Sequence, residues 1–103
     1  MPGKISTNNK GEENIIYIGN KKPMVYAIAV ATQFSNGTDV VTIKARGRAI
    51  SSAVDAAEIA KNKFIKNAKI KEIKTGTENV VNNEGRSINV SSIEICITTK
   101  NKK

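Results

Sequence analysis

Histidine is absent from this chain, and cysteine occurs once, as Cys96. Histidine is the commonest general base at neutral pH and the commonest ligand of protein-bound metals, so its absence argues against hydrolytic and metal-dependent chemistry. A single cysteine excludes an internal disulfide, and without a histidine to activate it we expect Cys96 to be a buried or inert thiol. We therefore expect no cofactor, no metal ion and no enzymatic activity.

Aromatic side chains are also scarce, at 4% of the residues: Tyr17, Tyr26, Phe34 and Phe64. Proteins that bind single strands by stacking present exposed rings on a strand, whereas we expect these four rings to lie in the core or at an interface. No apolar run has the length of a membrane span, and residues 1–13 lack the apolar segment of a signal peptide. We expect a cytoplasmic protein that has no membrane partner.

Cations, in contrast, are abundant, with 17 Lys or Arg against 9 Asp or Glu and a formal net charge of +8. The excess is uneven, because residues 21–74 carry eleven cations and four acids whereas residues 1–20 are balanced. Charge of one sign concentrated on one part of a protein attracts polyanions. Nucleic acid fits this pattern better than an anionic membrane, since no basic amphipathic helix carries bulky apolar anchors.

The spacing of apolar residues predicts one domain, residues 14–99, between a flexible polar tail (residues 1–13) and a basic tail (residues 100–103). Helical and strand periodicities predict the element order β-α-β-α-β-β. The expected elements are a strand at residues 14–18, a helix at 24–34 after Pro23, a strand at 38–45, a helix at 50–64, and a hairpin of strands at 69–78 and 86–99. Because the first helix is apolar nearly all round, we expect it to be buried.

The element order also predicts the sheet. Two strand-helix-strand crossovers favour parallel neighbours, and the hairpin adds an antiparallel pair. The fold class is therefore α/β, a two-layer α+β arrangement in which two helices cover one face of a mixed sheet with a long hairpin. In the last strand Ile88 and Val90 share one parity whereas Ile93 and Ile95 share the other. A bulge or a twist is therefore expected near residues 91 and 92.

Three groups of cations flank the expected strand and helix ends: Lys21 and Lys22 before the first helix, Lys44, Arg46 and Arg48 around the end of the second strand, and Arg86 beside the hairpin turn. If the strand ends converge, these groups form one anion-binding face, to which the positive end of the first helix adds. Gly47 lets the backbone approach a polyanion while the guanidinium groups on either side point outward. Each group also has a structural alternative: a solvated helix entry, a basic turn, or a hairpin charge that guards against edge aggregation.

Two further charge patterns are typical of ordinary surfaces. The lysines between residues 61 and 74 lie at the end of the expected helix and at alternating positions of the following strand. This pattern is typical of a solvent-exposed face. Asp55 and Glu58, three residues apart, are a remote candidate for the carboxylate pair of a small hydrolase. Acids in the first half of a helix are, however, expected from the helix dipole.

Several strings along the chain resemble the Alba family of archaeal chromatin proteins, and the resemblance extends from about Asn14 to Thr98. The strings are Ile18-Gly19-Asn20-Lys21-Lys22-Pro23-Met24, Ile43-Lys44-Ala45-Arg46-Gly47-Arg48-Ala49-Ile50, Ala57-Glu58-Ile59-Ala60-Lys61-Asn62-Lys63-Phe64, and the late strand Ser91 to Ile95. The resemblance implies a fold like the C-terminal domain of translation initiation factor three. It also implies a homodimer that binds double-stranded DNA, and often RNA, without marked sequence preference.

On matching positions, the resemblance implies phosphate contacts by the lysine pair before the first helix and by Arg46 and Arg48. The hairpin, with Arg86 near its tip, would reach toward the minor groove on either side of the dimer. Phe64 matches a phenylalanine that the family uses where dimers meet along DNA.

The family commonly shows Gly-Lys-Lys-Pro or Gly-Asn-Lys-Pro, whereas this chain has Gly19-Asn20-Lys21-Lys22-Pro23, with proline one position later. The lysine whose acetylation weakens DNA binding in some members is therefore absent here or represented by Lys21 or Lys22. Acetylation would act by removing a charge, and it implies an acetyltransferase and a deacetylase as partners.

Taken together, the residues and the resemblance predict a non-enzymatic, dimeric protein that coats and compacts chromosomal DNA in the nucleoid and also binds RNA. An alternative is an RNA-binding subunit of a ribonucleoprotein of the ribonuclease P type. Nothing in the sequence separates binding to A-form RNA from binding to B-form DNA, so this alternative stays open.

Overall fold

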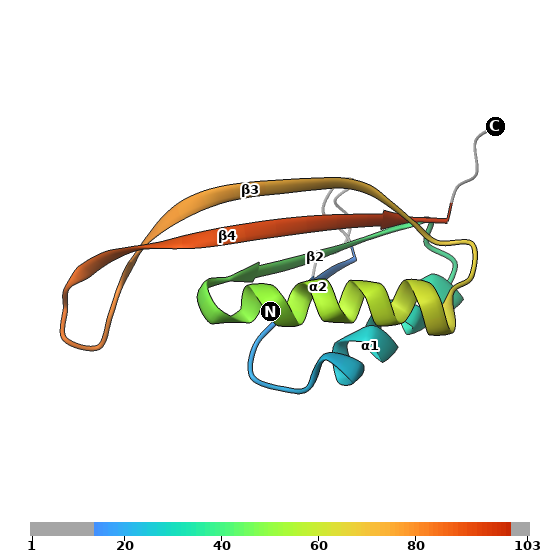
Figure 1. Ribbon diagram of the computed structural model, residues 1–103, viewed down its shortest axis with the longest axis horizontal. Helices are drawn as coiled ribbons and strands as arrows, with labels where there is room; N and C mark the ends of the chain where they lie inside the picture. The colour runs from blue at the N-terminus through green and yellow to red at the C-terminus, as the bar shows by residue number, and fades with distance from the viewer. Residues whose placement is uncertain (1–13, 100–103) are drawn as a thin grey trace.

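The computed structural model describes residues 14–99, which form a four-stranded sheet with two helices packed on one of its faces (Figure 1). Along the chain lie β1 (Ile15–Tyr17), α1 (Pro23–Ser35), β2 (Val40–Arg46), the 3-10 turn η2 (Gly47–Ala49), α2 (Ile50–Ile59), the π-helical turn η3 (Ala60–Phe64), β3 (Lys69–Val81) and β4 (Ser87–Thr98). The predicted fold class and element order are confirmed. The two predicted tails, residues 1–13 and 100–103, lie outside the described residues.

The strands lie in the order β1-β2-β4-β3. β1 is parallel to β2, and β4 runs antiparallel to both β2 and β3. The first crossover therefore joins parallel neighbours, as predicted, whereas the second joins two parallel strands that β4 separates. None of the helices within residues 14–99 combines the length and the apolar character that crossing a membrane requires.

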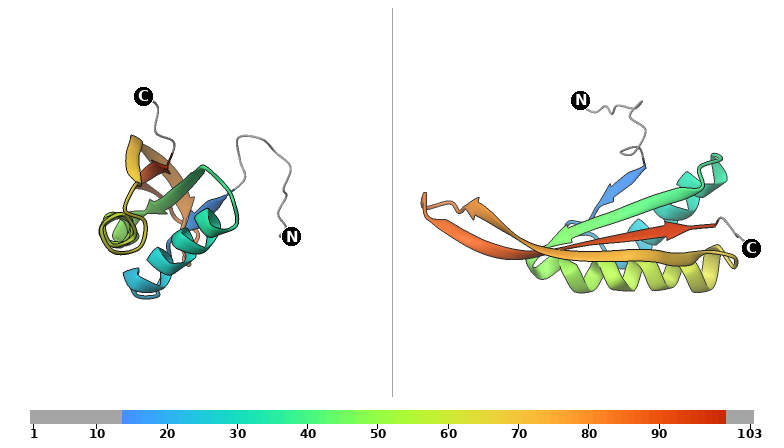
Figure 2. Two further views of the ribbon diagram at one scale, coloured as in Figure 1. Left: turned by 90° about the vertical axis from the view of Figure 1, so that its right-hand side faces the viewer. Right: turned by 90° about the horizontal axis from the view of Figure 1, so that it is seen from above.

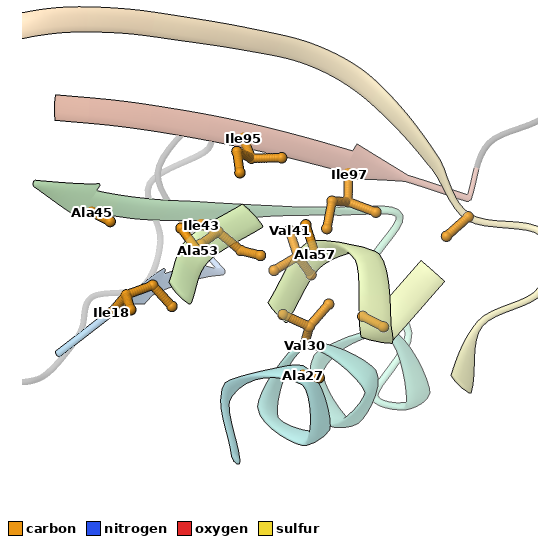
Figure 3. Packing of buried hydrophobic residues seen from close by; sticks show 12 residues of the cluster. Ile18, Ala27, Val30, Val41, Ile43, Ala45, Ala53, Ala57, Ile95 and Ile97 are labelled. Carbon is orange, nitrogen blue, oxygen red and sulfur yellow. The ribbon is translucent and has the colours of Figure 1, made fainter. Parts of the chain in front are cut away.

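The core lies between the sheet and the helices (Figure 3). The sheet contributes side chains of alternating residues, because successive side chains of a strand point to opposite faces. Those that face the helices and are almost completely buried are Val41, Ile43, Ile95 and Ile97. The helices contribute mostly small residues, among them Ala27, Val30, Ala53, Ala57 and Ala60. Alanines on α2 let this helix lie close to the sheet while keeping strong helix propensity.

α1 is less buried than its composition predicts. Pro23 opens the helix, as expected, but Ala27 and Val30 are its only buried residues. Met24, Val25 and Ile28 are 40–50% exposed. The helix packs against the rest of the molecule along one side, so the prediction of a buried first helix is wrong and an apolar surface remains open to solvent.

β3 and β4 form a hairpin that extends past the start of α2 as an arm (Figures 1 and 2). Pairing runs without a shift from Glu72 and Cys96 to Val81 and Ser87, so of the two alternatives expected near residues 91 and 92 the bulge is not found. The one irregularity lies on β3, between Ile70 and Glu72. The arm instead twists as it leaves the body (Figure 2). Near its tip the side chains of Val81 and Ile88 are exposed to solvent.

α2 begins at the expected residue, Ile50, but its regular part ends at Ile59. The following π turn is closed by a hydrogen bond of 2.8 Å, in which the Ile65 N–H donates to the Ala60 carbonyl oxygen. Such turns are rare and occur frequently at functional sites. Phe64, the last residue of the turn, is 43% exposed.

We expect the same substitution to have unequal effects at the two ends of β4. Ile95 is 2% exposed in the body and Ile88 is 41% exposed in the arm. Ile95→Ala should lower the free energy of unfolding by about 2–5 kcal/mol, because it leaves a cavity, whereas Ile88→Ala should cost less than about 1 kcal/mol. Urea denaturation of both variants at one protein concentration measures the difference. Equal losses would contradict the placement of the core.

Candidate functional site

Tyr26, near the start of α1, fixes the loop that joins β1 to α1. Its hydroxyl oxygen accepts the N–H of Gly19 at 2.9 Å and the N–H of Lys21 at 3.1 Å. A Cβ at Gly19 would lie 3.4 Å from this hydroxyl, so glycine lets the loop pass close to the ring. The loop side chains from Asn20 to Lys22 are exposed. Sequence reasoning missed Tyr26 as the residue that positions this loop.

The end of β2 meets this loop. Gly47 has a φ of 60°, in the left-handed region that glycine adopts without strain, and it turns the chain from β2 into η2. Arg46 and Arg48, on either side of it, are exposed. Both line one shallow hollow, together with Gly19, Asn20 and Ser52. Gly19 and Asn20, which directly precede the lysine pair, thus lie beside the two arginines, and we call Lys21, Lys22, Arg46 and Arg48 the basic cluster.

Lys22 stands beside acids of α2. It is the residue that precedes the first turn of α1, and it lines a second hollow with Asp55 and Glu58. The Glu58 carboxylate lies 3.6 Å from the Lys61 amine and accepts a hydrogen bond of 3.3 Å from the Asn62 amide. Asp55 and Glu58 are exposed, and the arrangement is that of surface acids rather than of a desolvated catalytic pair. Within residues 14–99 no three acidic or cysteine side chains gather in a way that would hold a metal ion.

Acids engage two of the predicted contact residues. Arg46 donates from Nη1 to Oε1 of Glu78 at 2.8 Å, and Lys44 Nζ lies 3.6 Å from Oε2 of Glu94. The four side chains are 34–58% exposed, so each pair contributes on the order of 1 kcal/mol or less. An incoming phosphate would compete with Glu78 for the same guanidinium group.

Sequence reasoning missed Glu78 because it lies 32 residues from Arg46. The strand order brings the two together, since β4 is the only strand between β2 and β3. Ser92 of β4 pairs with Arg46 on one side and with Gly76 on the other. These small residues leave room for the arginine side chain to cross β4 and reach Glu78.

Arg86 does not join the basic cluster. It directly precedes β4 in the connection between β3 and β4. This connection lies at the far end of the arm (Figure 1). The turn is held by the Asn82 side-chain oxygen, which accepts the N–H groups of Glu84 and Arg86 at 2.9 Å each. Gly85 supplies the positive φ, 81°, that the turn needs. The arm extends along the longest dimension of the molecule, which is 48 Å (Figure 1). Arg86 and the basic cluster therefore form two separate cationic regions, an arrangement that suits an extended ligand.

This chain is similar to known proteins. The family model described as Alba matches residues 14–77. A protein named DNA/RNA-binding protein Alba from Methanoculleus marisnigri is 54% identical over 87 residues, which are 84% of this chain and 94% of the relative. A protein of the same name from Methanocella arvoryzae is 51% identical over 84 residues, 82% of this chain and 88% of the relative.

The solved structures include Alba from Thermoplasma volcanium, which superposes with a TM-score of 0.78 at 52% identity. The match covers 82% of this chain and 99% of that one. The family model spans more than half of the chain, and relatives more than half identical cover most of it. This chain therefore belongs to the Alba family.

Proposed function

We propose that this protein is a non-enzymatic nucleic-acid-binding protein that grips the sugar-phosphate backbone, coats double-stranded DNA and also binds RNA. The observation that carries the proposal is the shared hollow of Arg46 and Arg48 with the loop that bears the lysine pair. These segments are far apart in the sequence, and each carries exposed cations among the residues that line the hollow or directly next to them. The family relatives, which are named as DNA/RNA-binding proteins, support the same reading.

The chemistry of the basic cluster favours phosphate over bases. Guanidinium groups present forked donors that match phosphate oxygens, and ammonium groups act as mobile point charges. All four side chains are exposed, so their attraction to a polyanion depends on salt and carries little information about sequence. The ion pair of Arg46 with Glu78 is also weak because both side chains are exposed, so a phosphate group can replace Glu78 as the partner of Arg46.

The arm supplies the second contact region. Its tip carries Arg86, and nearby Asn79 donates a hydrogen bond of 3.0 Å to Asn89 across the two strands. Ser87 donates to Asn79 at 2.8 Å, so this stretch of the arm is polar and internally ordered. We propose that the arm reaches along the duplex toward the minor groove while the basic cluster holds the backbone.

A homodimer completes the proposal. Large apolar side chains exposed on a small domain mark interaction surfaces, and here they include Met24, Val25 and Ile28 on α1, Val54 on α2 and Ile73 on β3. A second copy covering part of this surface would give a particle with two arms and two basic clusters. Phe64 would then lie where neighbouring dimers meet along DNA, which supports coating and compaction of the chromosome in the nucleoid.

Acetylation would tune the binding. Lys21 and Lys22 are both exposed and lie beside the loop held by Tyr26. Removing the charge of either lysine would weaken phosphate contacts, so an acetyltransferase and a deacetylase acting here would lower and restore the affinity.

Binding should depend steeply on salt. If each subunit neutralises roughly three phosphates, a dimer neutralises about six, and the slope of log affinity against log salt should be about −5. Fluorescence anisotropy of a labelled duplex, titrated at several KCl concentrations, measures this slope. An affinity independent of salt would rule out the phosphate contacts.

Arg46→Ala and Arg48→Ala should each weaken binding to unrelated duplexes by about tenfold, the size of one charge-assisted hydrogen bond. The matched control is Lys66→Ala, which removes one exposed charge outside the basic cluster. We expect it to change affinity by less than about twofold. If the arginine variants lost affinity for one sequence only, base readout would replace backbone contact as the explanation.

Glu78→Gln should strengthen duplex binding by about two- to fivefold, because Arg46 loses a charged competitor for phosphate. Glu72→Gln makes the same change of charge on the same strand, beside Lys74 at 3.8 Å, which lies outside the proposed contacts. Anisotropy at one salt concentration compares the two variants. An equal gain for both would show that net charge, not the release of Arg46, is responsible.

A further inference from the structure

A third hollow, distinct from the two described above, lies on the face of the sheet opposite the helices. It has a volume of about 440 Å³, and the side chains that line it include Tyr17, Lys44, Arg46, Glu78, Ser92 and Glu94. Lys44 and Arg46 alternate with the buried Ile43 and Ala45 on β2, which places their side chains on the face away from the helices. Their register partners Tyr17, Glu94 and Ser92 lie on the same face. We call this site the sheet hollow. Arg46 also lines the hollow of the basic cluster, so the two sites are continuous.

The charges of the sheet hollow are balanced internally. Lys44 lies 3.6 Å from Glu94, and Arg46 donates to Glu78 at 2.8 Å. A phosphate therefore gains little net attraction here compared with the basic cluster. The same groups offer hydrogen-bond donors and acceptors side by side, which is what the edge of a neutral nucleobase requires.

Tyr17 gives the sheet hollow an aromatic surface. Of the two places expected for the four rings, the core is excluded for this residue, which is 69% exposed. β1 is a strand of three residues at the edge of the sheet. Tyr17 pairs with Lys44 of β2, and both residues line the sheet hollow. An exposed ring on a strand beside cations is the usual platform for stacking an unpaired base.

We propose that the sheet hollow binds one unpaired nucleobase of a single-stranded nucleic acid, stacked on Tyr17, while the adjacent basic cluster holds the neighbouring phosphates. Bases within a duplex already stack on both faces and cannot occupy this site. The hollow therefore adds affinity for single strands only, whether RNA or DNA. This inference rests on the proposed function for its phosphate contacts.

The test compares binding of the full-length protein to a 20-nucleotide unstructured RNA, the DNA of the same sequence and the corresponding duplex. Tyr17→Ala and Tyr17→Leu should weaken binding to both single strands by about tenfold, the effect of losing one base-aromatic stack. Tyr17→Phe keeps the ring and should stay within about twofold of the wild type. Binding to the duplex should change by less than about twofold in all three variants, which also shows that they are folded.

A second measurement uses the intrinsic fluorescence of the protein, which has no tryptophan and two tyrosines. Addition of the single-stranded RNA should quench the emission of the wild type, and Tyr17→Phe should abolish most of this quenching while binding persists. Persistent quenching in Tyr17→Phe would overturn the proposal, because the ring at position 17 would then not contact the base.

Other outcomes are equally decisive. Unchanged binding of Tyr17→Ala and Tyr17→Leu to single strands would overturn the proposal, as would equal losses for single strands and duplex. A loss confined to RNA would place the 2′-hydroxyl group, not the base, in the hollow. A wild-type protein that binds neither single strands nor duplex would contradict the phosphate contacts of the proposed function itself.

Discussion

The position of β4 between β2 and β3 is the constraint on which the rest of the molecule depends. On its inner side Ile95 and Ile97 complete the core against the helices. On its outer side Ser92 is small enough for Arg46 to reach Glu78 on the next strand. Its remaining length pairs with β3 beyond the body and makes the arm. β4 thus completes the core, lets the ion pair on the outer face form, and provides one of the two strands of the arm.

The cations of this protein fall into two electrostatic classes. Those of the β1–α1 loop and Arg48 lie in exposed loops, where their charge acts on an approaching polyanion. Lys44 and Arg46 lie on the sheet beside acids, which orient them and reduce their net field. Arg46 belongs to both sites because it ends β2 at the boundary between them. A fold with only a few elements thereby separates a surface for phosphate from a surface suited to neutral groups.

The sequence predicted the elements well because their periodicities are strong and local. Alternation predicted the strand at residues 38–45, and the structure has β2 there, with Val41 and Ile43 on its buried face. Helical spacing predicted the start of α2 at Ile50. The failures concern what covers each surface. The apolar composition of α1 predicted a buried helix, but the helix packs against the rest of the protein along one side only. Tyr17 is exposed because it lies on β1, a short strand at the edge of the sheet.

The candidate site was predictable where its residues are close in sequence and not where strand order joins them. Arg46 and Arg48 are recognisable from the glycine between them. The ion pair of Arg46 with Glu78 forms because the strand order brings the two residues together. The hydrogen bond of Tyr26 with Gly19 forms because the loop before α1 passes close to the ring.

The hydroxyl of Tyr26 ties α1 to two successive stretches of the loop before it, through the N–H groups of Gly19 and Lys21. The opposite flank of the same helix is apolar and open to solvent. A partner that docked on this open flank would therefore contact the same helix that holds the loop of the lysine pair.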